Sequence, residues 1–101
     1  MSDSFSESEI QIGSNRYRKW IIVTNLTANT WAYVNTLPNP SNAIINSGLS
    51  FVQAENAFRY PLDFNLTGIS CRINYNTGMI QAYSIPETIY SNIYLCVEYS
   101  K

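Results

Sequence analysis

Histidine is absent from this chain of 101 residues, and charged side chains are scarce. Lys and Arg number 6 and Asp and Glu 7, so charged residues make up 13% of the chain, against about 25% in typical globular proteins. Without histidine there is no Ser-His-Asp or Cys-His catalysis and no imidazole ligand for zinc. The few basic residues are too scattered to displace the counterions of a nucleic acid. We therefore expect no catalytic residue, no metal, no cofactor and no nucleic-acid partner.

Long apolar runs are missing as well. No stretch reaches the roughly 20 apolar residues that span a bilayer. The N-terminus is acidic and polar, where an export signal would be basic and then apolar. We expect no membrane insertion and one domain over residues 1–101, with residues 1–5 as a flexible tail.

Residues that favour helices are sparse, and no segment sustains the three-and-four spacing of a helix. β-branched and aromatic residues dominate the apolar positions, and turn residues recur at short intervals. The sequence predicts an all-β fold, an antiparallel β-sandwich of about seven to eight short strands, with no helix required. The candidate strands lie near 7–12, 16–24, 30–36, 43–53, 57–62, 69–75, 79–84 and 92–99.

One hairpin stands out, with strands over 69–75 and 79–84 joined by Asn76-Thr77-Gly78. Gly78 can adopt the positive φ that a three-residue hairpin loop requires. The two prolines of Pro38-Asn39-Pro40 remove backbone donors, which predicts a loop over the edge of a sheet.

The last candidate strand is apolar on both faces, which is typical of a central strand or of one that a second surface covers. Ile93, Leu95, Val97 and Tyr99 form one face. Tyr94, Cys96 and Glu98 form the other, and we expect them at an interface between copies of the chain.

The same alternation separates the two cysteines. Cys71 shares a face with Ile69, Ile73 and Tyr75, which points it into the core. Cys96 lies opposite the expected core set of its own strand, so we expect no disulfide.

The only basic cluster is Arg16-Tyr17-Arg18-Lys19-Trp20, which offers a docking place for a sugar phosphate or an anionic glycan. The interpretation we favour is structural. These cations either guard an exposed edge strand or pair with Glu7, Glu9 or a neighbouring subunit.

Aromatic residues with amide neighbours are typical of sugar-binding sites, because the ring packs against C–H groups while the amides form hydrogen bonds with hydroxyls. Packing in the core or at an interface is the alternative for each of them. The candidate ligand-binding residues are Trp31, Tyr33, Asn35, Tyr83, Tyr90 and Asn92.

A polysaccharide hydrolase would need two carboxylates held across a cleft. No two acidic residues are an obvious pair in the sequence. The hydrolase hypothesis would require Glu55, Asp63 and Glu87 to converge in one cleft. We expect that they do not.

Four short motifs in order resemble a small all-β domain at the C-terminus of bacteriophage tail fibre and baseplate proteins. These domains open on an aromatic-Ser-x-x-Glu stretch that leads to a Gly and a Tyr-Arg-Lys step, and they close on Glu-Tyr-Thr-Lys. The matching segments are Phe5 to Gly13, Tyr17-Arg18-Lys19, the hairpin from Ile69 to Ser84 with Tyr90-Ser91-Asn92, and Leu95 to Lys101. The chain departs from the pattern at Ser14-Asn15-Arg16, where the family carries a longer run, and at Asn35, a position that the family often fills with histidine.

The resemblance implies a virion component that is made in the bacterial cytoplasm, assembles as a homotrimer with other phage tail proteins and binds bacterial surface glycan. It also leaves open a purely structural domain that trimerises or caps the fibre.

Overall fold

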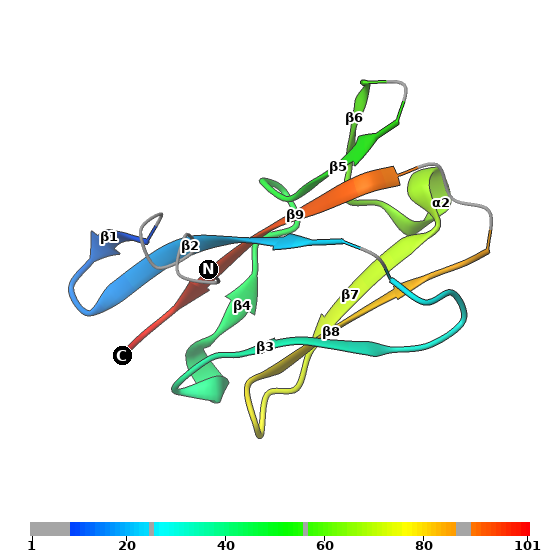
Figure 1. Ribbon diagram of the computed structural model, residues 1–101. Coiled ribbons are helices and arrows are strands. Elements are labelled where there is room, and N and C mark those ends of the chain that lie inside the picture. The colour runs from blue at the N-terminus through cyan, green and yellow to red at the C-terminus, as the bar shows by residue number, and fades with distance from the viewer. Residues whose placement is uncertain (1–8, 25, 56, 87–89) are drawn as a thin grey trace.

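The computed structural model describes residues 9–24, 26–55, 57–86 and 90–101. Within these ranges nine strands form two antiparallel sheets that face each other (Figure 1), which confirms the predicted all-β sandwich. The strands are β1 (Ile10–Gly13), β2 (Arg16–Val23), β3 (Ala32–Thr36), β4 (Ile44–Ile45), β5 (Phe51–Ala54), β6 (Arg59–Pro61), β7 (Ile69–Ile73), β8 (Met79–Ser84) and β9 (Tyr90–Tyr99).

The larger sheet has the order β1-β2-β9-β5-β6, and β4 also pairs with β9. The smaller sheet has the order β3-β8-β7. The last strand is therefore central, which is one of the two alternatives that its apolar faces left open. β9 pairs with β2 along one edge and with β4 and β5 along the other.

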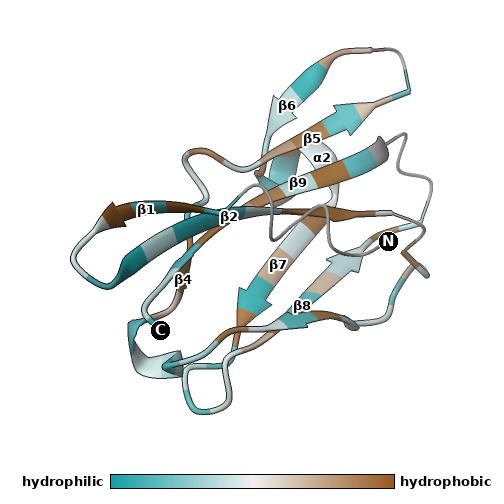
Figure 2. Ribbon diagram, turned by 60° about the vertical axis from the view of Figure 1, so that its left-hand side comes forward, coloured by the Kyte–Doolittle hydropathy of each residue, from teal (hydrophilic) through white to brown (hydrophobic). Residues whose placement is uncertain are grey.

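The core lies between the two sheets and is built by alternate residues of their central strands. Ile93, Leu95 and Val97 of β9 are fully buried against Ile80 of β8 and Ile69 of β7. Each such side chain contributes about 1.5–3 kcal/mol to the free energy of unfolding. Figure 2 shows the hydrophobic and hydrophilic bands that this alternation produces along the strands.

The β7–β8 hairpin is confirmed. β7 ends at Ile73, earlier than predicted, because Asn74 begins the turn: its Oδ1 accepts hydrogen bonds from the backbone N–H groups of Asn76 at 2.8 Å and Thr77 at 3.1 Å. Gly78 has φ 78°, and its carbonyl accepts from the N–H of Leu37 at 2.9 Å. The hairpin loop is thereby attached to the end of β3.

Two short helical turns lie between the strands, although the all-β prediction required no helix. A 3-10 turn covers Pro40–Asn42 inside the predicted proline loop, and one helical turn, α2, covers Phe64–Thr67. Asp63 caps α2 by accepting from the N–H of Asn65 at 2.9 Å, and Gly68 ends it at φ 71°. Neither is long enough to show periodicity in a sequence. Among the described residues, no helix has the length and apolar character needed to cross a membrane.

The single strand predicted over 43–53 is two strands, β4 and β5. Residues 46–50 form a turn between them, in which the N–H of Ser50 donates to the carbonyl of Asn46 at 3.1 Å. The turn permits the chain to leave β9 and return to pair with it further along.

Both cysteines are free thiols, as predicted. Cys71 lies on the inner side of β7 and packs against the core, whereas Cys96 lies on the outer side of β9 opposite Trp20. The larger sheet therefore separates the two sulfur atoms.

Candidate functional site

The outer surface of the smaller sheet carries three of the six predicted sugar-binding residues. Alternation on β8 turns Ile80 and Ala82 into the core and leaves Gln81 and Tyr83 outside. Gln81 is the cross-strand partner of Arg72 on β7 and of Tyr33 on β3. We call this outer surface, together with the adjoining hairpin loop, the polar face.

Arg72, on the edge strand β7, is held in place across the polar face. Its Nε donates to Oε1 of Gln81 at 2.9 Å, and its guanidinium carbon lies 3.9 Å from the centroid of the Trp31 ring. Trp31 in turn packs on Tyr83, with ring centroids 5.2 Å apart, and the Tyr83 hydroxyl donates to Oδ1 of Asn29 at 3.1 Å. The indole therefore supports Arg72, since the guanidinium covers one of its faces.

Two other rings of the polar face are open to a ligand. Tyr33 is 64% exposed and Tyr75, in the hairpin loop, is 74% exposed. The Tyr33 hydroxyl lies 3.1 Å from Oγ1 of Thr36, so the side chain extends along β3 toward the hairpin end of the sheet. These rings are the ones available for stacking.

A pocket of about 330 Å³ adjoins Tyr75. This volume is at the lower end of the about 300–1,000 Å³ typical of small-molecule sites. Because Asn74 uses Oδ1 in the turn, its amide nitrogen is left to donate. The pocket is lined by Arg72, Ile73, Asn74, Tyr75, Asn76 and Gln81.

The structure groups three of the six predicted ligand-binding residues: Trp31, Tyr33 and Tyr83. Asn35 is on β3 too, but its Oδ1 accepts from the N–H of Thr36 at 2.7 Å. Asn92 lies on β9 in the other sheet, opposite Gln53.

Tyr90 also belongs to β9, and its side chain is outside what the structure describes. Sequence reasoning missed Arg72, Gln81 and Tyr75. Alternation on the predicted 69–75 strand placed Arg72 opposite the core set, which was the available signal.

The outer surface of the larger sheet, the apolar face, differs in chemistry. A row of apolar side chains crosses three strands, from Ile22 on β2 through Tyr94 on β9 to Phe51 on β5. The Phe51 and Tyr94 rings stack with centroids 4.7 Å apart, and Trp20 lies 5.9 Å from Phe51. Ile22 remains 42% exposed.

The three residues predicted at an oligomer interface all lie on the apolar face, but they are not equally accessible. Tyr94 is half-buried in the ring stack. Cys96 is 0% exposed within the single chain, so it has no surface to offer a partner. Glu98 is engaged by neighbours in its own chain.

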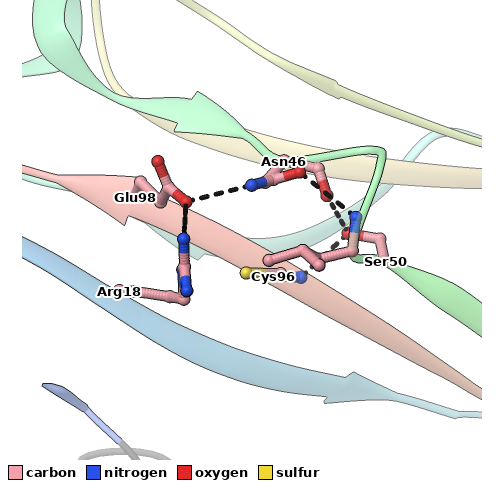
Figure 3. Close-up of polar contacts among 6 residues, drawn as sticks. Arg18, Asn46, Ser50, Cys96 and Glu98 are labelled. Atoms are coloured by element: carbon pink, nitrogen blue, oxygen red, sulfur yellow. Dashed lines mark hydrogen bonds and ion pairs between the residues drawn. The ribbon is translucent and has the colours of Figure 1, made fainter. Parts of the chain in front are cut away.

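Glu98 belongs to a polar network at one end of the apolar face (Figure 3). Its Oε2 accepts from Nε and a terminal nitrogen of Arg18, at 3.0 and 2.8 Å, and from Nδ2 of Asn46 at 3.0 Å. Ser50 Oγ donates to the Asn46 carbonyl at 2.8 Å and accepts from the N–H of Cys96 at 2.9 Å. The network fastens the 46–50 turn to β9.

This arrangement corrects the interpretation of the basic cluster. β2 pairs with β1 as far as Arg18 and with β9 on its other side, so Arg18 guards no open edge, and it pairs with Glu98 rather than Glu9. Glu9 instead pairs with Lys101 at 2.8 Å, and Glu7 lies outside the described residues. Arg16 donates to the carbonyl of Asn42.

The titration of three groups follows from these surroundings. The hydrogen bond from Asn46, followed by that from Arg18, lowers the pKa of Glu98. Burial raises the pKa of Cys96 against the opposing charge of Arg18, and it raises the pKa of Cys71 to about 12. Both thiols are therefore protonated at neutral pH and pack as apolar groups.

The carboxylates considered for hydrolysis have other surroundings. Asp63 caps α2, Glu55 lies exposed in the turn after β5, and Glu87 is outside the described residues. In the part of the chain that the structure describes, no three His, Cys, Asp or Glu residues gather closely enough to hold a metal ion.

No protein-family model, curated protein or solved structure matches this chain.

Proposed function

We propose that this chain is a non-enzymatic domain of a phage tail fibre or baseplate, located in the virion, whose polar face binds polysaccharide on the bacterial surface. The motif order described above supports the phage context. The observation that carries the binding role is the pocket in which Arg72, Asn74 and Gln81 lie beside the exposed ring of Tyr75.

The chemistry of this pocket suits a sugar. Amide and guanidinium groups bond hydroxyls, and an exposed tyrosine offers an apolar ring with a polar tip. The surroundings are polar and nearly uncharged, since β3, β7 and β8 contain no acidic residue and Arg72 as their one cation. A shallow site of this kind binds weakly by itself, and several copies on one fibre would multiply the effect through avidity.

The experiment is retention of the intact protein on a bacterial polysaccharide array and on whole cells. Tyr75→Ala should weaken binding by about tenfold, as expected for removal of a central aromatic contact. Phe58→Ala, which removes a 66% exposed ring next to β6 of the larger sheet, is the matched control and should bind as the wild type does. Absence of retention on every surface by an intact oligomer contradicts the proposal.

A second candidate function is fibre assembly, with the apolar face joining copies of the chain into a trimer. It is favoured by the exposed side chain of Ile22 beside the Phe51–Tyr94 stack. The two functions use opposite surfaces of the sandwich, so one domain can perform both.

A further inference from the structure

We infer that the polar face selects anionic glycans, those bearing a carboxylate or a phosphate, and that Arg72 is the residue that reads the negative charge. This inference rests on the proposed function and specifies its ligand class.

The first argument is that the terminal nitrogens of Arg72 are available. Within the described residues, its only hydrogen bond is from Nε to Gln81, and the ion pairs found there join Arg18 to Glu98 and Lys101 to Glu9. An arginine carries five N–H donors, so most of the guanidinium fork remains to be satisfied. Water satisfies it in the free protein, and an anionic oxygen pair satisfies it better.

The second argument is that the guanidinium is already ordered. The Trp31 ring at 3.9 Å and the Gln81 oxygen at 2.9 Å hold its plane from two directions. A long side chain usually loses rotamer entropy when it binds, and a side chain that is held beforehand loses less. A planar fork fixed in this way matches the two oxygens of a carboxylate or phosphate.

The third argument is position. Arg72 lines the pocket together with Asn74, Asn76 and Gln81, so an anion on the guanidinium has amide groups beside it for the neighbouring sugar hydroxyls. The cations of the basic cluster on β2 are otherwise engaged, since Arg18 is bonded to Glu98, Arg16 to backbone and Ser100, and Lys19 lies over the Tyr99 ring at 5.5 Å.

The test compares acidic polymers with neutral counterparts of the same backbone. The probes are oligogalacturonate against its carboxyl-reduced form, and dextran phosphate, which carries its phosphates as side-group esters, against unmodified dextran, each at low and high salt. Wild-type protein should bind at least one acidic polymer about tenfold more tightly than its neutral counterpart, with the preference shrinking at high salt. A preference on the first pair identifies a carboxylate ligand, and one on the second pair a phosphate ligand.

The chain supplies a closely matched control. Arg59 also donates from Nε to a glutamine, Gln53, at 2.8 Å, and it also lies over an aromatic ring, that of Phe51, at 4.9 Å. It is on the larger sheet, away from the pocket. Arg72→Gln and Arg59→Gln change the net charge equally, and only Arg72→Gln should abolish the preference.

The possible failures are distinct. Equal binding of acidic and neutral polymers by the wild type overturns the anionic class and leaves the proposed function standing. A preference that survives Arg72→Gln, or that Arg59→Gln removes equally, overturns the role of Arg72. Failure to bind any polysaccharide overturns the proposed function itself. Thermal denaturation of both variants verifies that they are folded.

Discussion

The two outer faces of this sandwich repeat one local arrangement in different surroundings. On each, an arginine donates from Nε to the glutamine directly across the strand pair and lies over an aromatic ring: Arg72 with Gln81 and Trp31, and Arg59 with Gln53 and Phe51. The two guanidinium groups are held in nearly the same way.

The neighbours differ. Around Arg72 lie tyrosines, amides and an open pocket, whereas Phe51 beneath Arg59 continues into Tyr94 and Trp20. A guanidinium over a ring is thus a stabilising unit that can occur on either sheet, and the groups one strand away set the chemistry of the surrounding surface.

The largest effect on stability should come from a substitution at Gly78, where the hairpin loop is attached to the end of β3. Gly78 has φ 78°, and a Cβ added there would overlap the carbonyl oxygen of Leu37. Relieving this overlap would require the end of β3 to move away from the hairpin. Gly78→Ala should lower the free energy of unfolding by about 2–4 kcal/mol, measured by urea denaturation.

The control for this variant lies on the other sheet. At Gly13 a Cβ would be 3.5 Å from Cβ of Arg16, an ordinary contact, so Gly13→Ala should change stability little. Similar losses of unfolding free energy in both variants would show that the close approach of Gly78 to Leu37 does not constrain the hairpin loop.

A second, smaller effect tests whether the apolar face assembles copies of the chain. Ile22→Lys would place a charge where we expect an apolar contact, and loss of one buried isoleucine is worth about 1.5–3 kcal/mol. The dissociation constant of the oligomer should rise by roughly 10–100-fold in analytical ultracentrifugation, while each chain keeps its glycan affinity.

Leu66→Lys replaces an exposed apolar side chain of α2 and should leave association unchanged. A wild-type protein that stays monomeric at high concentration, or an Ile22→Lys variant that associates normally, would remove the assembly role from the apolar face.

The smallest effect is the loss of stability at low pH. The pKa of Glu98 is lower in the folded chain than its ordinary value of 4.5, so the unfolded state takes up a proton first. The resulting stabilisation is complete above the unfolded-state pKa and is lost as the pH falls through the folded-state pKa. Acid should therefore loosen the 46–50 turn and β9 before it affects the polar face, whose strands carry no carboxylate.

Hydrogen exchange at decreasing pH measures this order of opening. Glu98→Gln should flatten the acid part of the stability profile, and Asn46→Ala, which removes the largest cause of the lowered pKa, should shift the acid loss to higher pH. Early exchange in β7 and β8 would contradict the assignment.

The sequence was sufficient for several parts of the fold because their determinants are local. The alternation around Cys71 and Cys96 predicted free thiols on different sides, and Gly78 located the hairpin loop. The short helix after Asp63 and the break between β4 and β5 escaped prediction, since each depends on a few capping or turn bonds that leave no periodic pattern.

For the candidate site, sequence reasoning found the tryptophan and two of the tyrosines but missed Tyr75 and the arginine beside it. Trp31, Tyr33 and Tyr83 were named for their chemistry alone. Alternation placed Arg72 outside the core, but its partners could not be predicted, because pairing with Gln81 depends on register, and a shift of one residue would turn Arg72 toward the core.

The sequence by itself determined an all-β chain with little charge, a last strand that is apolar on both faces and a hairpin closed at Gly78, because period-two alternation and positive φ are properties of neighbouring residues. Only the tertiary structure decided that Arg72 meets Trp31, that Arg18 is neutralised by Glu98, and that the predicted Asn92 belongs to the opposite surface. These contacts join residues far apart in the chain, and strand order and register, set by burial of the common core, bring them together.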